Sequence, residues 1–294
     1  MNIQLPKPGK YVLAVSGGLD SVCLLDILAK TQSYDLIVAH FDHGIRPDSG
    51  LDEHFVGELA KMYGLDYVQA FGNLGATASE AAARKARYVF LGETVNANRA
   101  RALITAHHQG DRLETAIINL IRGTGRRGLS SLRETGAIKR PFLKVTKDEL
   151  RQYAMRQHLS WREDSTNADT RYLRNYIRHH IVTRLSERQI NELLELIDRQ
   201  ELLNKRLDRV LAGLVTQHQQ KLSIRLFNVM PYSVSKELMA AWLRANRLLN
   251  FDRKTIERLT VAAKTKRPGT KINIYGDATM TVHKGFLALS TSER

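Results

Sequence analysis

The chain has 294 residues, of which 43% are hydrophobic, and its formal net charge is +15. It has no run of about 18 apolar residues, which excludes an ordinary membrane-spanning helix, and its first residues lack the apolar stretch of a signal peptide. A single cysteine, Cys23, excludes an intrachain disulfide and a zinc or iron–sulfur site built from cysteines. We therefore expect a cytoplasmic protein with no membrane partner.

Positive charge is concentrated in the later part of the sequence. Residues 1–110 contain 10 Lys and Arg against 11 Asp and Glu, whereas the remaining residues contain 35 against 19. Such an excess favours a polyanionic partner, most simply a nucleic acid. A solvated basic surface without a ligand is the alternative, because net charge alone accounts only for non-specific attraction.

The first half of the chain alternates between strand and helix patterns. Apolar runs predict strands at Tyr11–Val15, Asp35–Phe41, Tyr67–Phe71 and Ala102–Ala106. Helical periodicity covers 20–30, 51–63, 79–95 and Asp111–Ile121. Strands that alternate with helices predict an α/β fold with a doubly wound parallel sheet, in which ligands bind beyond the carboxyl ends of the strands.

The loop between the first strand and the first helix has the sequence Ser16-Gly17-Gly18-Leu19-Asp20-Ser21. Unpaired N–H groups and the helix dipole favour an anion there, and the glycines allow a phosphate to approach the backbone. The loop is not a Walker A motif, because no lysine follows the glycines. An ordinary glycine-rich turn is the simpler alternative. The whole pattern resembles the pyrophosphate-binding loop of the N-type ATP pyrophosphatases.

Polar residues also follow the later strands of the predicted sheet. His40, Asp42 and Arg46 come after the second strand, while Asp111 and Glu114 start a helix after the fourth or fifth. Asp111 and Glu114 are three residues apart on the predicted helix, so their carboxylates lie on one face of it. Carboxylates beside a triphosphate suit Mg²⁺ binding or the steering of an amine, although Asp111 could instead be a helix cap.

Several motifs occur in a characteristic order along the first 185 residues. They are Ser-Gly-Gly-Leu-Asp-Ser, His-Phe-Asp-His-Gly-Ile-Arg, Glu80-Ala-Ala-Ala-Arg84-Lys-Ala-Arg87-Tyr88, Thr-Ala-His-His-X-X-Asp-X-X-Glu-Thr, Arg122-Gly-Thr-Gly, Arg140-Pro141-Phe-Leu, Asp164-Ser-Thr-Asn167 and Arg174-Asn175-X-X-Arg178. Together they resemble the tRNA(Ile)-lysidine synthetases. That resemblance implies that ATP adenylates C2 of the wobble cytidine of a tRNA(Ile) with a CAU anticodon. The ε-amine of free L-lysine then displaces AMP to give lysidine.

The resemblance also implies a set of site residues. The ATP-binding residues would be Ser16, Gly17, Gly18, Leu19, Asp20, Ser21, His40 and Arg46. The catalytic residues would be Asp42, Arg84, Asp111, Glu114, Arg174 and Arg178. Mg²⁺ would be held by Asp20 and Asp111. One departure is Gly110, which stands where the family usually has the first of two aspartates, while Asp111 and Glu114 are both kept.

Residues 122–188 form a strongly basic segment, with 16 Lys and Arg against 7 Asp and Glu. Arg174 and Arg178 lie one turn apart on one helix face, and an arginine fork suits a triphosphate or a tRNA backbone. Pairing with Asp164 or Asp169 is the simpler alternative. Thr146-Lys-Asp-Glu is a capping box that predicts the start of a further helix.

The rest of the sequence predicts a connecting helix and a small α+β module. One long helical pattern covers about 186–220. Helices are expected near 235–247 and 252–264, and strands at Thr270–Ile274, Thr279–His283 and Phe286–Leu289. We therefore expect a catalytic domain at 1–185, a helical linker at 186–222 and a tRNA-binding domain at 223–294.

Two other functions remain alternatives. A tRNA thiolase of the same superfamily would activate a base identically, but its sulfur chemistry resembles that of proteins with paired cysteines or a cluster. A non-catalytic, nucleotide-gated RNA-binding protein is favoured only by Gly110. The sequence leaves the oligomeric state open, a homodimer included.

Overall fold

The structure is a computed structural model that describes residues 1–44, 49–72, 80–163, 169–216 and 221–290. It divides into two compact units, Met1–Gln200 and Glu201–Arg294. None of the helices in the described ranges combines the length and apolar character needed to cross a membrane.

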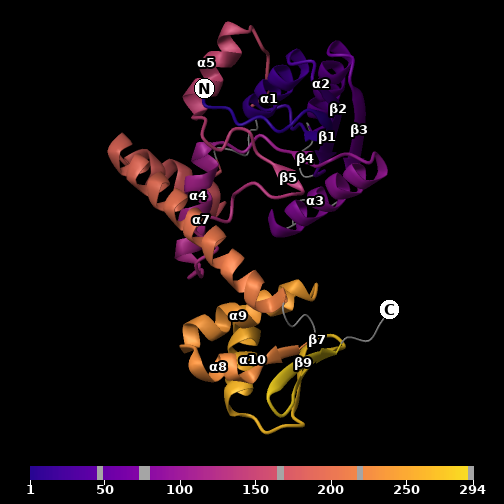
Figure 1. The fold of residues 1–294 in the computed structure, drawn as a ribbon. Coiled ribbons are helices and arrows are strands. Elements are labelled where there is room, and N and C mark those ends of the chain that lie inside the picture. Colours follow the sequence, from indigo (N-terminus) through magenta and orange to yellow (C-terminus); the bar gives the residue numbers. More distant parts are fainter. Residues whose placement is uncertain (45–48, 73–79, 164–168, 217–220, 291–294) are drawn as a thin grey trace. The chain divides into compact units, whose positions relative to one another are not determined.

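The first unit contains a five-stranded parallel sheet in the order β3-β2-β1-β4-β5 (Figure 1). Its strands are β1 Gly9–Ala14, β2 Tyr34–Asp42, β3 Asp66–Phe71, β4 Leu103–Ile104 and β5 Ile138–Lys139. The order reverses beside β1, so the carboxyl ends of β1 and β4 flank a topological switch point, where ligands bind in such sheets. The predicted α/β fold class is confirmed.

Helices cover both faces of this sheet. Their bounds are α1 Leu19–Lys30, α2 Ser49–Met62, α3 Glu80–Ala97, α4 Gln109–Ile121, α5 Lys147–Arg156 and α6 Leu173–Tyr176, followed by a π-helical turn at Ile177–Ile181 and a 3₁₀ turn at Val182–Arg184. On one face, Leu24 of α1 and Leu150 of α5 join a core with Leu13 and Val38 of the sheet. On the other face, Leu91 of α3 packs among sheet residues. The sheet is therefore doubly wound.

The expected strands and helices of this unit agree with the structure except near its edge. The run Ala102–Ala106 forms a strand only at Leu103–Ile104, because these are the residues that pair with β1 and β5. Strand β5 has two residues, too few to give a recognisable apolar alternation. The expected helix start at Thr146 is confirmed, since its side chain and that of Glu149 form a reciprocal capping box.

The second unit pairs helices with a four-stranded antiparallel sheet in the order β6-β9-β8-β7. Its elements are β6 Lys221–Ser223, α8 Ile224–Val229, α9 Tyr232–Ala245, α10 Arg253–Thr265, β7 Lys271–Tyr275, β8 Ala278–Val282 and β9 Phe286–Ser290. Fully buried Trp242, Phe227 and Met280 lie in its core. The two predicted helices and three predicted strands are confirmed, whereas β6 and α8 were not anticipated because both are short.

The long helical pattern forms one helix, α7 Glu187–Thr216. Near its start, Leu194 and Ile197 pack with Leu113 of α4. Near its end, Leu211 and Val215 belong to the core of the second unit. The boundary between the two compact units therefore falls within this helix.

Candidate active site

The glycine-rich loop connects β1 to α1 and is closed by its own hydroxyl groups. Ser21 Oγ donates to the carbonyl oxygen of Gly18 at 2.9 Å and accepts the Ser16 N–H at 3.2 Å, and the two hydroxyl oxygens are 3.2 Å apart. Gly17 has a φ of +85°, a conformation that favours glycine. The N-terminus of α1 follows at Leu19, so its free N–H groups and dipole form a ready anion site.

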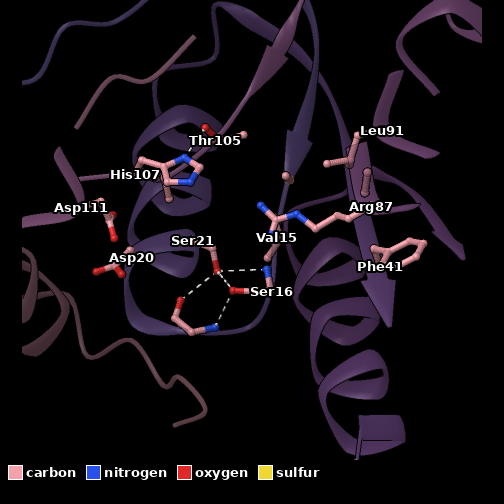
Figure 2. A pocket seen from close by; sticks show the side chains of 14 residues that line it. Val15, Ser16, Asp20, Ser21, Phe41, Arg87, Leu91, Thr105, His107 and Asp111 are labelled. Carbon is pink, nitrogen blue, oxygen red and sulfur yellow. Dashed lines mark hydrogen bonds between the residues drawn. The ribbon is translucent and has the colours of Figure 1, made fainter. Parts of the chain in front are cut away.

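A cavity of about 170 Å³ opens beside this loop (Figure 2). Its polar lining comes from four segments, the loop, α1, α3 and the residues after β4. These side chains belong to Ser16, Asp20, Ser21, Arg87, Thr105, His107 and Asp111. Its apolar lining includes Ala14, Val15, Ala39, Phe41 and Leu91. The cavity therefore combines an apolar part with hydroxyl groups, two acids and one arginine.

The two acids of the cavity, Asp20 and Asp111, share His108 as a neighbour, and Asp20 also binds Lys147. Lys147 Nζ donates to both oxygens of Asp20, at 2.7 and 2.8 Å. His108 Nε2 lies 3.9 Å from Asp20 Oδ2 and 3.7 Å from Asp111 Oδ2. Figure 2 shows the Asp20 and Asp111 carboxylates on the same side of the cavity. Asp20 and Asp111, the expected Mg²⁺ ligands, thus lie together beside the loop, and we call this pair the acidic corner of the cavity.

The start of α4 explains why position 110 is glycine here. His108 is the N-cap residue, and its Nδ1 accepts the Gly110 N–H at 3.0 Å. Asp111 completes a capping box by accepting the His108 N–H at 2.9 Å. A Cβ atom at position 110 would lie 2.8 Å from His108 Cε1, so an aspartate there would displace the imidazole. Gly110 therefore permits the cap that directs His108 Nε2 toward the two acids.

Two arginines hold the carboxylates of α4. Arg178 donates to both oxygens of Glu114, at 2.6 and 3.0 Å, and its Nη2 lies 3.7 Å from Asp111 Oδ1. Arg174 Nη1 lies 3.6 Å from Glu114 Oε2 and 3.7 Å from Asp111 Oδ1. Glu114 is 3% exposed, so this charge needs such partners. Arg174 and Arg178 thus pair with the predicted catalytic acids.

Pairing of the same arginines with Asp169 or Asp164 was the simpler alternative. The Asp169 carboxylate binds Arg171 instead, at 2.7 Å. Asp164 lies outside the described residues. Asp111 does cap the start of α4, as the alternative predicted. Its carboxylate also lines the cavity and lies near both arginines. Asp111 is therefore a structural cap and a cavity residue at once.

Burial and neighbouring groups set the charges in this corner. Burial by itself would raise the pKa of Asp111, but His108, His107, the His108 N–H and Arg174 together hold the pKa below its usual value. Burial lowers the pKa of His107 to about 3, so its imidazole is neutral near pH 7. Asp111 is thus an anion at neutral pH, suited to attract a cation rather than to accept a proton strongly.

Other residues expected at the site lie elsewhere. His40 is buried and its Nδ1 is 2.9 Å from the carbonyl oxygen of Val15, so it contacts the backbone of a cavity residue without lining the cavity itself. Asp42 is buried and accepts the Gly44 N–H at 2.8 Å. Arg84 is exposed, with its guanidinium 5.0 Å from the Tyr88 ring. None of these three lines the cavity, and Arg46 lies outside the described residues.

The two carboxylates of the acidic corner could supply only some of the ligands that a magnesium ion needs. No group of three or more His, Cys, Asp or Glu residues that could hold a metal occurs within the described ranges. Mg²⁺ commonly uses one or two carboxylates together with phosphate oxygens and water. Asp20 and Asp111 supply such a pair beside the anion-binding loop, so the donor set is compatible with Mg²⁺ bound together with a nucleotide.

The structure adds Arg87, His107, His108 and Lys147 to the surroundings of the cavity. Arg87 and the two histidines belong to the motifs quoted from the sequence. Arg87 follows Arg84 by one helical turn, and this spacing could have indicated that it lies on the same side of the helix. Lys147 follows a capping residue, which gave no indication of its contact with Asp20, 127 residues away.

The model of the PP-loop domain, an ATP-binding family, matches residues 2–185. This chain belongs to that family, which supports the use of ATP by its first unit. It is 34% identical over 251 residues to a tRNA(Ile)-lysidine synthase of Haemophilus ducreyi, a match that covers 81% of this chain and 58% of the relative. A tRNA(Ile)-lysidine synthase of Geobacter sulfurreducens is 40% identical, with 60% of this chain and 40% of the relative covered.

These relatives are longer than the match, since the chain spans about 40 to 60% of their length. Among solved structures, a U34-tRNA thiolase, NcsA of Methanococcus maripaludis with its [4Fe-4S] cluster, is similar with a TM-score of 0.54 and 17% identity. The match covers 69% of this chain and 72% of the thiolase, and it supports the fold alone.

Proposed function

We propose that this chain is a ligase that joins lysine to C2 of the wobble cytidine of a tRNA(Ile) with a CAU anticodon, through ATP-dependent adenylation of the base. AMP and pyrophosphate would be the other products. The observation that carries this proposal is the pair of half-buried Asp111 and buried Glu114, held by Arg174 and Arg178 beside the cavity. The names of the relatives support the same reaction.

The first step needs the triphosphate to be held while the base attacks. The N–H groups at the start of α1 and the hydroxyls of Ser16 and Ser21 would bind the pyrophosphate part of ATP. The cytidine O2 would attack the α-phosphorus, and pyrophosphate would leave with the electron pair of the broken bond. Mg²⁺ held at Asp20 and Asp111 would supply positive charge to the phosphates.

The second step needs a cationic amine to reach the adenylated base. Asp111 and Glu114 would attract the ε-ammonium group of lysine, because Glu114 is buried, Asp111 is half-buried and the pKa of Asp111 is lowered. After the ammonium loses a proton to solvent, the amine would attack C2, the C2–O bond to the adenylyl group would break, and AMP would leave with the electron pair of that bond. Arg174 and Arg178 would keep the two carboxylates in position, since each arginine contacts both.

The direct test is incubation of the chain with ATP, labelled lysine and unmodified tRNA(Ile), followed by nucleoside analysis. We expect labelled lysidine, with AMP and pyrophosphate formed only when this tRNA is present. Ser16→Ala and Asp20→Ala should abolish AMP formation but leave tRNA binding within a few-fold, because the loop meets phosphate rather than tRNA. Insertion of sulfur, or full adenylation by both variants, would refute the proposal.

A further inference from the structure

The segment that follows α5 holds the glycine-rich loop by a backbone hydrogen bond. Leu159 and Trp161 of this segment pack against the core of the first unit. The N–H of Arg162 then donates to the carbonyl oxygen of Gly17 at 3.0 Å. The loop between β1 and α1 therefore depends on a residue that lies far along the chain.

This hydrogen bond fixes the orientation of the peptide group between Gly17 and Gly18. In a trans peptide, the carbonyl oxygen and the following N–H point in opposite directions. Because Arg162 binds the Gly17 carbonyl, the Gly18 N–H is directed to the other side, where Ser16 Oγ lies 3.4 Å from the Gly18 nitrogen. Both Ser16, which Figure 2 labels, and Gly18 line the cavity. The Gly18 N–H thus faces the side from which an anion would bind.

A pair of glycines needs such a constraint. Gly17 has a φ of +85°, and with no side chain at either position the peptide group can rotate at little steric cost. Rotation by half a turn would direct the Gly17 carbonyl oxygen into the cavity, where its partial negative charge would repel a phosphate. A donor whose direction is fixed beforehand binds an anion without such a reorganisation. The Arg162 N–H therefore selects the orientation that can bind a phosphate.

Arg162 is itself fixed by helix α2. Its Nε donates to Asp52 Oδ1 near the start of that helix, and the side chains of Arg162 and Asp52 are 34% and 12% exposed. One turn later, Phe55 and Val56 lie against the loop, since both would be 3.4 Å from a Cβ atom at Gly17. Helix α2 therefore supports the loop directly through these two residues and indirectly through Arg162.

We propose that Arg162 is a positioning residue of the glycine-rich loop, and that its ion pair with Asp52 keeps the Gly18 N–H directed at the bound phosphate. Neither of the two charged side chains lines the cavity, so they act through the backbone rather than by contact with the nucleotide. This role rests on the proposed binding of pyrophosphate by the loop, but it requires neither lysine nor tRNA.

The test compares ligands that contain phosphates with one that lacks them. Equilibrium binding of pyrophosphate, ATP and adenosine is measured with the full chain, Arg162→Gln, Asp52→Asn, the double variant and Arg162→Lys. The control is Arg151→Gln, which breaks a different ion pair, with Asp148 on α5. We expect Arg162→Gln and Asp52→Asn each to weaken pyrophosphate and ATP by about 10-fold, the lower end for a lost hydrogen bond to a charged group. Adenosine should change by less than about 2-fold.

The remaining variants distinguish positioning of the loop from general support of the fold. The double variant should bind pyrophosphate no more weakly than either single variant, because both substitutions break one ion pair. Arg162→Lys should stay within about 3-fold of the wild-type affinity, since an ammonium group can still pair with Asp52. Arg151→Gln should leave the affinity for all three ligands unchanged.

Weaker pyrophosphate binding by Arg162→Gln together with unchanged or tighter binding by Asp52→Asn would overturn the proposal, because Arg162 would then contact the phosphate itself. Equal weakening of adenosine, or unchanged pyrophosphate affinity in both variants, would overturn it as well. If Arg162→Gln does not fold, as judged by circular dichroism, Asp52→Asn decides, since it replaces a carboxylate by an amide of the same size. A chain that makes no lysidine could still show the expected pattern, so the two proposals fail separately.

Discussion

The two compact units of the chain use positive charge differently. Around the cavity of the first unit, Lys147 and Arg178 bind carboxylates at 2.6 to 2.8 Å, and these pairs fix the positions of acids. The second unit, residues 201–294, has 17 Lys and Arg against 7 Asp and Glu. There, exposed Lys254, Lys266 and Arg267 have no carboxylate within 4.0 Å in the described ranges.

This difference separates two functions of charge. A short ion pair determines geometry at one point, whereas an unpaired excess attracts a polyanion over roughly a Debye length of 8 to 10 Å. Changes to the paired charges should therefore alter turnover, and changes to the unpaired charges should alter affinity and its salt dependence.

The largest effect is expected at the paired acids. Asp111→Asn or Glu114→Gln should lower lysidine formation by at least about 10²-fold, the scale for a positioned electrostatic group. Binding of tRNA should stay within a few-fold, because both carboxylates are at most half-exposed and face arginines rather than solvent. The measurement is single-turnover product formation together with tRNA affinity.

Asp169→Asn is the matched control for these variants. This acid also pairs with an arginine, Arg171, but lies away from the cavity lining, so near wild-type turnover is expected. Wild-type rates in both acid-pair variants would instead show that Asp111 and Glu114 only start and support α4.

Local sequence predicted the loop and the acid pair because neighbours in the chain define them. Six consecutive residues place Ser16 and Asp20 at a helix start, and a spacing of three places Asp111 beside Glu114. The predicted positions of the strands then follow from apolar runs. These features need no knowledge of distant contacts.

The partners of those acids could not be predicted in the same way. Arg178 reaches Glu114 across 64 residues and Lys147 reaches Asp20 across 127, so both contacts depend on how α4, α5 and the 173–181 segment pack. Similarly, His40 and Asp42 follow the expected strand pattern, but hydrogen bonds to the Val15 carbonyl and the Gly44 N–H occupy them. A strand end places a residue near a site without determining where its side chain points.

An intermediate effect is expected from the unpaired cations of the second unit. Changing Lys254, Lys266 and Arg267 to glutamine should weaken tRNA binding and flatten the dependence of log affinity on log salt. Each lost phosphate contact should reduce that slope by roughly 0.7 to 0.9. ATP affinity should not change, because the PP-loop cavity belongs to the first unit.

Charge substitution tests this point better than truncation near residue 215. Leu211 and Val215 are buried in the core of the second unit, so they and α7 are needed for its packing. An unchanged salt slope in the triple variant would contradict a tRNA-binding role for this unit. The phosphate contacts would then be sought in the basic residues of 122–188.

The smallest effect is expected at Cys23, which distinguishes an amine from sulfur as the second substrate. The thiol is fully buried on α1 and donates to the Leu150 carbonyl oxygen at 3.4 Å. Burial raises the pKa of Cys23 to about 12, so the thiol stays protonated near pH 7 and is a poor nucleophile. A structural role in the α1–α5 contact follows, and a persulfide relay from a single buried thiol is disfavoured.

Cys23→Ala and Cys23→Ser should therefore retain lysidine formation within about 2-fold. The free energy of unfolding should fall by about 1 to 2 kcal/mol, because alanine leaves a small cavity and serine buries a hydroxyl. Thermal or denaturant unfolding measures the second quantity, and nucleoside analysis measures the first. Loss of activity in a variant that unfolds at the wild-type denaturant concentration would support the thiolase alternative, since the sulfur atom would then take part in the reaction rather than in the packing of α1 against α5.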